Sequence, residues 1–511
     1  MAARRLIQLL LLLLAGASLR SAEAPILVGA RRQLFVDRKF IQSDAGISLR
    51  MNPPAKAGVA LTGDRPWEQG WLTGSGYVAE DRGSFKMWYT VIPPDVRPGE
   101  GGLLCYAESD DGRVWRKPNL GVYEWNGTRA NNILLRAVVE SNVFIDPSAS
   151  DTDRYKFVTV LTDRHGFQPP EGDGMYVYLS GDGLRWRLHP KRVFPFRPDT
   201  VNHALYDTRL KKYVVYVRIW DPLRKVGRVE TADILQPWPY DQSVPRVMVY
   251  GSPREYPGKH VPTAFGYDEQ DPAQSDHYNS AAVQYPWAAD AYFMFPSPYL
   301  HFPEPPKGRL RNEGLLDVQM AVSRDGVRYE RVERWPYVEC GLEGAPDSRQ
   351  LYMLTGMLRV GNEIYQYYAG FPFTHGGYQG IDESWLKKLG TIFRVVQRPD
   401  GFVSVDAPMA GGSFLTPLVQ FEGRRLALNF NASAMGEVRV ELRDGGGKPI
   451  PAFTFDDCDP LHGNDVNRTV TWKGQSNVAA LAGRPVRVAF RLRAVKLYAF
   501  HFVNDAGERL Q

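Results

Sequence analysis

One short phrase occurs three times along this chain and constrains its fold more than any other feature. The phrase is Ser-x-Asp-Gly-x-x-aromatic, and it covers 109–115, 180–186 and 323–329. Asp-Gly is typical of the two-residue turn that reverses a strand, so the phrase predicts a hairpin whose aromatic residue opens the next strand. A hairpin that returns at intervals of tens of residues indicates a repeat architecture.

Short strand patterns around these turns group into five units of four strands. The units begin near residues 71, 141, 202, 277 and 351, and their second strands are rich in aromatic residues. We therefore expect an all-β chain in which 25–408 form a five-bladed β-propeller, a ring that protects its sheet edges by closure. Leu34–Val36 is expected to complete the last blade. A large β-sandwich with unrelated Asp-Gly turns is the alternative.

The pattern changes after Asp406. Gly411, Gly412 and Ser413 are typical of a linker, and strands with regular alternation follow, at 425–430, 438–442, 486–492 and 496–500. Such alternation predicts sheets with one buried and one solvated face. We therefore expect a β-sandwich domain over 409–511.

The N-terminus has the order of an export signal. Arg4 and Arg5 precede an apolar run at 6–14, and small residues follow up to Ala24. This order predicts a signal peptide over 1–24 and a secreted or periplasmic protein. The run is shorter than the ~20 apolar residues that a spanning helix needs. A retained N-terminal anchor is the alternative.

Charge and cysteine content narrow the possible partners. The net charge of +5 is spread over 511 residues without basic runs, so we expect neither nucleic acid nor a membrane surface as a partner. Three distant cysteines, Cys105, Cys340 and Cys458, define no disulfide framework. We expect no cofactor, although the many acidic residues leave calcium possible. The oligomeric state is unknown from the sequence.

Polar residues stand just before or within the first strand of each predicted blade. In a propeller these inner strands line a central channel, so their leading ends meet at one mouth. We expect a convergent pocket there. Its predicted catalytic residues are Asp199, Asp276 and Glu68, and its predicted substrate-binding residues are Asn142, Asn202, His203, His277, Asp347, Arg349, His301 and Trp67. As the alternative, short polar residues at such junctions only bond to nearby backbone.

Several carboxylates in one cleft suit the cleavage of a glycosidic bond. The reaction needs one protonated acid for the leaving oxygen and one ionised carboxylate to activate water or attack the sugar. Crowding raises some carboxyl pKa values and leaves others low. From their positions in the blades, we predict that Asp199 and Asp276 form the acid/base pair and that Glu68 is a third carboxylate.

The repeated turns, the export signal and the trailing β-domain resemble the five-bladed β-propeller glycoside hydrolases, of the invertase/levanase and arabinanase types. Four phrases resemble secreted invertase-like proteins of planctomycete-type bacteria: Leu34–Asp37, Arg65–Glu68, Phe85–Tyr89 and Met294–Ser297. The resemblance covers nearly the whole mature chain and implies a glycosidase acting on a plant or algal glycan. The family's second-blade Asp-Pro phrase has a match in Asp146-Pro147, whereas its first-blade Asp and its general-acid phrase have none.

Two other functions remain open. The missing first-blade Asp favours a propeller that binds carbohydrate without cleaving it. A sialidase-like enzyme would need three arginines around the substrate carboxylate, and Arg349 is the one arginine that the sequence places near the predicted mouth.

Overall fold

The computed structural model of this chain is almost entirely β-structure. It describes residues 24–69, 71–94, 101–137, 142–163, 166–199, 201–245, 247–249, 252–254, 257–288, 290–302, 313–376 and 390–504. The helices in these ranges are short 3-10 turns: η1 (Arg38–Phe40), η2 (Pro66–Glu68), η3 (Asp151–Asp153), η5 (Gly258–His260) and η6 (Ala479–Leu481). No described helix could cross a membrane. Residues 1–23, nearly all of the predicted signal peptide, lie outside the described ranges.

Two compact units make up the described chain. Leu49–Ser404 forms one of them, and the described residues before Leu49 and after Ser404 form the other. The short strands β4 (Ser48–Met51) and β30 (Val403–Ala407) cover the points where the chain passes from one unit to the other. The sequence had placed 25–48 with the propeller, whereas this segment belongs to the second unit.

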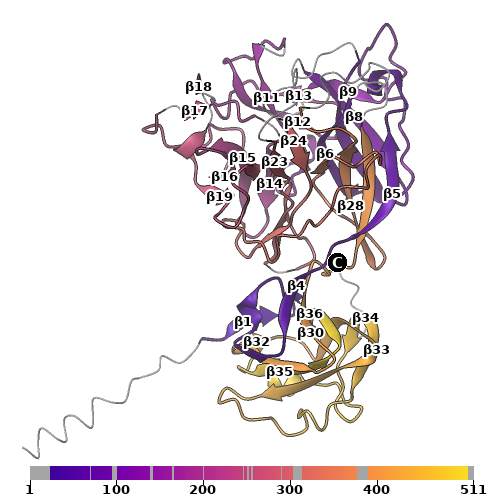
Figure 1. The fold of residues 1–511 in the computed structure, drawn as a ribbon, viewed down its shortest axis with the longest axis vertical. Helices are drawn as coiled ribbons and strands as arrows, with labels where there is room; N and C mark the ends of the chain where they lie inside the picture. Colours follow the sequence, from indigo (N-terminus) through magenta and orange to yellow (C-terminus); the bar gives the residue numbers. More distant parts are fainter. Residues whose placement is uncertain are drawn as a thin grey trace, which may run out of the picture. The chain divides into compact units, whose positions relative to one another are not determined.

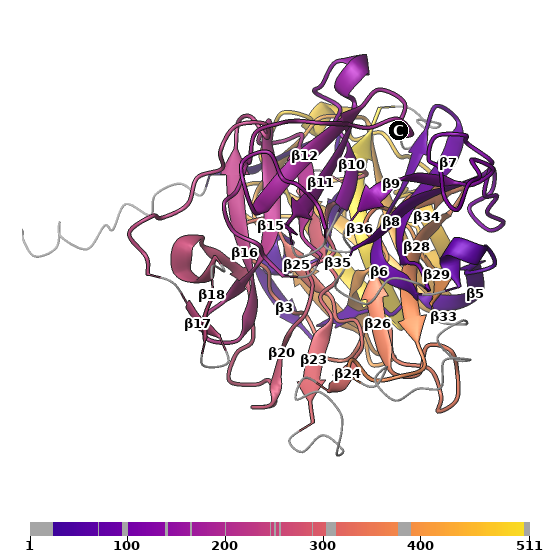
Figure 2. The same cartoon turned by 90° about the horizontal axis from the view of Figure 1, so that it is seen from above.

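Four consecutive antiparallel sheets of the first unit are arranged like the blades of a propeller. Figure 2 shows their strands following one another around a common centre in chain order. The sheets are β6 (Trp71–Asp81), β7 (Ser84–Ile92), β8 (Gly102–Ser109), β9 (Ile133–Ala137); β10 (Asn142–Ile145), β11 (Tyr155–Leu161), β12 (Gly174–Ser180), β13 (Arg187–Leu188); β14 (His203–Asp207), β15 (Lys212–Trp220), β16 (Arg224–Thr231), β19 (Thr263–Phe265); and β21 (Ala282–Gln284), β22 (Tyr292–Met294), β25 (Ala321–Ser323). The predicted all-β, propeller-like architecture is confirmed.

A further sheet of this unit joins the two ends of its chain. Its strands lie in the order β20 (Ser275–His277), β23 (Pro298–His301), β24 (Gly314–Leu316), β26 (Gln350–Met353), β28 (Glu363–Phe371), β29 (Thr391–Gln397), β5 (Ala55–Thr62), and β27 (Leu358–Val360) also pairs with β28. β17 (Val247–Val249) and β18 (Ser252–Arg254) form a separate hairpin. The early strand β5 pairs with the late strand β29, so the first unit is closed by strands from both of its ends.

The three Ser-x-Asp-Gly phrases each reverse the chain as predicted, but over seven residues rather than two, because the flanking pairs are Glu108 with Arg116, Leu179 with Arg187 and Val322 with Glu330. The bonds within the phrase recur each time. At the second turn the Asp182 carboxylate accepts the backbone N–H groups of Leu184 and Arg185, both at 2.8 Å, and the Ser180 hydroxyl accepts that of Gly183 at 2.9 Å. Gly183 has φ +75°, which glycine adopts without strain. The acid and the glycine of the repeated phrase are therefore explained by local backbone chemistry.

Each turn also bonds to an aromatic side chain of another sheet. Trp88 on β7 donates to the Gly183 carbonyl at 2.7 Å, and Tyr216 on β15 donates to that of Gly326 at 2.7 Å. Tyr367 on β28 donates to the Gly112 carbonyl at 2.5 Å, which joins the first four-stranded sheet to the sheet of β28. The repeated phrase therefore bonds neighbouring sheets to each other. The aromatic residues that bond to it lie on the second strands of those sheets.

The second unit is built around a large sheet of its own. This sheet contains β3 (Ser43–Ala45), β31 (Gly412–Leu415), β35 (Arg487–Arg493), β33 (Arg425–Arg443) and β36 (Val495–Val503), with β2 (Gln33–Leu34) paired to β36 and β34 (Leu461–Thr469) paired to β33. β1 (Ile26–Gly29) lies beside β32 (Val419–Phe421) in this unit (Figure 1).

The prediction that Leu34–Val36 completes the last blade is wrong. Leu34 pairs with Ala499, and the buried Phe35 packs against Phe414 and Phe490 with ring centroids 5.5 and 6.3 Å away. All three residues of the segment are buried, so it joins the core of the second unit rather than a half-solvated sheet edge.

Candidate functional site

Asp199 stands just before β14, and a buried arginine holds its carboxylate. Arg218, near the end of β15, donates to Asp199 across 3.0 Å. The buried Asn202 accepts the backbone N–H of Arg218 at 3.0 Å and donates to the Pro198 carbonyl at 3.1 Å. Asn202 therefore fixes the loop of Asp199 against the strand of Arg218. The Asp199 side chain remains 36% exposed, whereas that of Arg218 is 1% exposed.

Asp276 on β20 has a similar arginine and, in addition, a histidine. Arg224, at the start of β16, donates to one carboxylate oxygen of Asp276 at 2.9 Å. Nε2 of His301, at the end of β23, lies 3.2 Å from the other oxygen. Asp276 is 1% exposed and His301 is 23% exposed. The pair thus places a partly open imidazole on a buried carboxylate.

Tyrosine and histidine rings join the two acids into one cluster. The guanidinium of Arg218 lies 4.2 Å from the ring centroid of Tyr278, and that of Arg224 lies 5.7 Å from the same ring. His375 packs against Tyr278 with centroids 4.7 Å apart, and its Nδ1 lies 3.2 Å from the hydroxyl of Tyr352. We name this set the polar cluster; it consists of Asp199, Arg218, Arg224, Asp276, Tyr278, Tyr299, His301, Tyr352 and His375.

Both acids of the cluster are held ionised. Burial raises the pKa of Asp199, but the charges of Arg218 and Arg224 outweigh it and bring that pKa below its ordinary value. Burial also raises the pKa of Asp276, but His301 and Arg224 outweigh this effect and lower that pKa to about 2. Sequence reasoning expected crowding to raise the pKa of one acid. The arginines reverse that effect, so neither acid carries a proton near neutral pH.

The third predicted carboxylate, Glu68, has its partners elsewhere. It accepts from the Tyr89 hydroxyl and from Nζ of Lys117, both at 2.5 Å, and lies 1% exposed in a hydrophobic core. Burial raises its pKa despite Lys117. The neighbouring Trp67 donates to the Asn132 side chain at 3.0 Å. Glu68 and Trp67 thus bond to residues in and beside the β6–β9 sheet, rather than to the acids and arginines of the polar cluster.

Three more predicted residues also lie in other contacts. Asp347 bonds to Lys56 and to the Tyr368 hydroxyl, each at 2.7 Å. Arg349 pairs with the exposed Glu343 at 2.6 Å. His277 is buried against Phe265, with ring centroids 4.7 Å apart, and burial lowers its pKa to about 4.

Two predicted residues tie the inner strands to one another. Asn142 donates to the Thr355 hydroxyl at 3.1 Å and accepts the backbone N–H of Ala204 at 2.9 Å. His203 accepts the N–H of Ala281 at 3.1 Å and contacts the Ser280 hydroxyl at 2.7 Å. Burial lowers the His203 pKa to about 3, so the ring is neutral. These bonds link β10, β14, the segment before β21 and the segment after β26.

Sequence reasoning missed the arginines Arg218 and Arg224. Arg218 lies in the run Val-Val-Tyr-Val-Arg-Ile-Trp, in which six of the seven residues are apolar or aromatic. A charged residue inside a strand that is otherwise buried almost always has a charged partner. That signal was available and pointed to a nearby acid.

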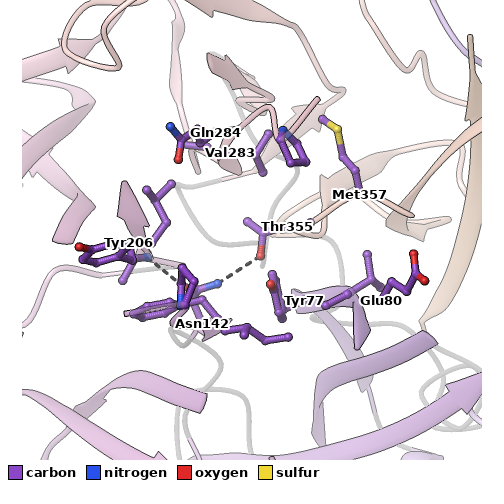
Figure 3. Close-up of a pocket in the computed structure, with 18 of the residues that line it drawn as sticks. Tyr77, Glu80, Asn142, Tyr206, Val283, Gln284, Thr355 and Met357 are labelled. Atoms are coloured by element: carbon purple, nitrogen blue, oxygen red, sulfur yellow. Dashed lines mark hydrogen bonds between the residues drawn. The ribbon is translucent and has the colours of Figure 1, made fainter. Parts of the chain in front are cut away.

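A pocket of about 450 Å³ lies at the far ends of the same inner strands. It is lined by the last part of β6, by residues of β10, β14 and β21 that include the first residues Asn142 and Ala282, and by the segment after β26. Figure 3 shows Tyr77, Glu80, Tyr206, Gln284 and Met357 around it, with the Asn142 bonds beneath. We call it the strand-end pocket.

Comparisons with known proteins give structural matches only. No family model and no curated protein matches the chain. Among solved structures, a glycoside hydrolase matches at 12% identity and a TM-score of 0.43, over 68% of this chain and 92% of its own. An N-acetylgalactosamine deacetylase from F. plautii, in complex with blood group B trisaccharide, matches at 12% identity and 0.43, over 69% and 96%. A glycosyl hydrolase from Bacteroides ovatus matches at 16% identity and 0.39, over 74% and 96%. Likenesses of this size assign no activity.

Proposed function

We propose that this protein is a secreted glycoside hydrolase that cleaves a plant or algal glycan at the polar cluster. In this proposal Leu49–Ser404 is a five-bladed propeller whose fifth blade is β26, β28, β29 and β5, and the second unit is a β-sandwich. The observation that carries the proposal is the joining of two ionised carboxylates and a partly open imidazole at the leading ends of the inner strands.

Asp199 is assigned as the base. Its carboxylate is ionised and open to solvent over about a third of its surface. It can therefore take a proton from a water molecule that attacks the anomeric carbon. Arg218 and Asn202 fix its orientation, which holds the reacting geometry without loss of entropy at each turnover.

His301 is assigned as the proton donor. Neither Asp199 nor Asp276 holds a proton, whereas imidazole is the side chain that can both hold and release one near neutral pH. Asp276 contacts Nε2 of His301 and so orients the ring. His301 gives its proton to the leaving glycosidic oxygen as water adds to the sugar and Asp199 accepts the water proton. Asp276 is a positioning residue in this scheme.

A second candidate is a propeller that binds carbohydrate without cleaving it. The lowered pKa of both acids favours it, because neither Asp199 nor Asp276 holds a proton that it could donate. A sialidase-like site is not supported. Arg218 and Arg224 are at most 3% exposed and already hold carboxylates, so they offer no free arginines to a substrate.

The test is release of reducing sugar by the full-length protein from arabinan, arabinoxylan, levan, inulin and agar. We expect release from at least one polymer and a fall of at least ~10²-fold in Asp199→Asn. Asp110→Asn, which changes an acid that is 76% exposed, is the matched control and should retain wild-type turnover. Equal turnover in Asp199→Asn would refute the site. Binding to a polymer without release would support the second candidate instead.

A further inference from the structure

We propose that the strand-end pocket is a second carbohydrate site, which binds a neutral saccharide of one or two sugar units without cleaving it. The choice of a sugar rests on the proposed function. The existence of the site rests on the pocket itself. Its volume of about 450 Å³ falls within the range of about 300–1,000 Å³ that is usual for small-molecule sites.

Aromatic side chains at the pocket supply the apolar surface that a sugar ring needs. Tyr206 and Trp287 are partly exposed and line it. Aromatic rings of this kind offer broad apolar faces to the C–H side of a pyranose or furanose. Tyr206 packs edge-on against Tyr213 at 5.2 Å, and Trp287 packs edge-on against Tyr285 at 5.2 Å, so both rings are held in place before a ligand arrives.

The pocket offers both hydrogen-bond acceptors and hydrogen-bond donors. Glu80, at the end of β6, is exposed, and its carboxylate has no hydrogen bond or ion pair among the described residues. A carboxylate only accepts, whereas the Trp287 indole and the Arg359 guanidinium only donate. A sugar hydroxyl both donates and accepts, so a polyol satisfies this mixed set. An apolar ligand would leave the Glu80 charge desolvated.

The balance of charge favours a neutral ligand and excludes hydrolysis there. Among the described residues that line the pocket, Glu80 is the one acid, and Arg154 shares Asp81 with Lys86. Glu80 and Arg359 oppose each other in sign, and a polyol can bond to both without a net charge of its own. A single carboxylate lacks the partner that glycosidic cleavage requires.

The Asn142 bonds set the strand-end pocket apart from the polar cluster. Asn142 and Thr355 line the pocket and bond to each other, while Thr355 also exchanges backbone hydrogen bonds with β6, at 2.9 and 3.0 Å. These bonds cross between inner strands of three sheets. Two sites on the same strands are therefore compatible with separate occupancy.

The experiment titrates full-length Asp199→Asn protein, which is expected to be inactive, with xylobiose, arabinobiose, sucrose and mannobiose up to about 10 mM. Binding is followed by saturation-transfer NMR and calorimetry. Glu80→Gln is then added to this background, because Glu80 is exposed and its loss should not affect folding. Trp287→Ala tests the aromatic wall, and Trp335→Ala, which removes a ring that is 65% exposed elsewhere, is the matched control.

We expect one of the four sugars to bind, with affinity reduced about tenfold by Glu80→Gln and unchanged by Trp335→Ala. The second site would be overturned if none of the four sugars binds. It would also be overturned if Glu80→Gln and Trp287→Ala each bind sugar as tightly as the Asp199→Asn parent. Neither result bears on the proposed function, which is judged by sugar release from wild-type protein. Conversely, binding that depends on Glu80 in a protein that releases no sugar would sustain this site alone.

Discussion

The two ends of the inner strands differ in whether their acidic side chains are paired with buried arginines. At the leading ends, Asp199 and Asp276 each hold an arginine that is at most 3% exposed. At the far ends, the strand-end pocket holds a single exposed acid, Glu80. A buried charge is tolerated only with a partner, and that partner also fixes its position. The leading ends therefore hold fixed, charged groups of the kind that catalysis needs. The far ends hold a surface suited to binding a ligand.

Removal of the proton donor tests this division most strongly. In His301→Gln we expect turnover to fall by ~10²–10⁴-fold, because protonation of the leaving oxygen is lost. Glu80→Gln, at the other end of the strands, should leave turnover unchanged. The measurement is kcat on a polymer from which the wild-type protein releases sugar. Wild-type kcat in His301→Gln would show that the donor lies elsewhere.

Asp276→Asn should reduce stability as well as turnover. The substitution removes the carboxylate to which Arg224, 3% exposed, bonds directly, and leaves Asp199 as the other acid of the cluster that its charge meets. Breaking a buried pair from one side costs about 3–5 kcal/mol. Urea unfolding of the variant against wild type measures this loss, with the exposed Asp110→Asn as control. An unchanged unfolding midpoint would mean that Arg224 finds another partner.

Sequence reasoning succeeded where the chemistry is local. The Ser180–Gly183 turn is set by side chain-to-backbone bonds within a few residues, so its phrase was enough to predict that the chain reverses there, although the reversal takes seven residues rather than two. The nearness of Asp199 and Asp276 followed from one geometric idea, that the leading ends of inner strands meet.

The sequence was insufficient where distant segments decide a residue's partner. Glu68 looked like a member of the mouth, but its ionic partner, Lys117, is 49 residues away and its other neighbour, Tyr89 on β7, is 21 residues away. Neither pairing has a local signature. Arg218 was overlooked because a single charge in an apolar run carries no information about which acid it will meet.

The pH dependence of stability should reflect a neutral histidine between the two ends. Burial lowers the pKa of His203 from 6.5 to about 3, so the unfolded chain binds a proton that the folded chain refuses. The stability that comes from keeping this ring neutral is fully present above pH ~6.5. As the pH falls toward 3, His203 lowers the free energy of unfolding by about 1.4 kcal/mol per pH unit. Urea midpoints measured from pH 7.5 to pH 4.5 should fall less steeply in His203→Gln than in wild type. Parallel slopes would assign the acid sensitivity to other groups.

The smallest expected effect concerns the bonds between the two ends. Asn142→Ala leaves the N–H of Ala204 without its acceptor and the Thr355 hydroxyl without its donor, which should cost about 1–3 kcal/mol in unfolding free energy. Because the polar cluster has its own supports in Asn202 and the arginines, kcat should change little. Thr355→Val is the matched control, since it removes the hydroxyl but leaves Asn142 to accept from Ala204. A large loss of turnover in Asn142→Ala with normal stability would mean that the two ends communicate through this residue, and the separation argued here would have to be replaced by coupling.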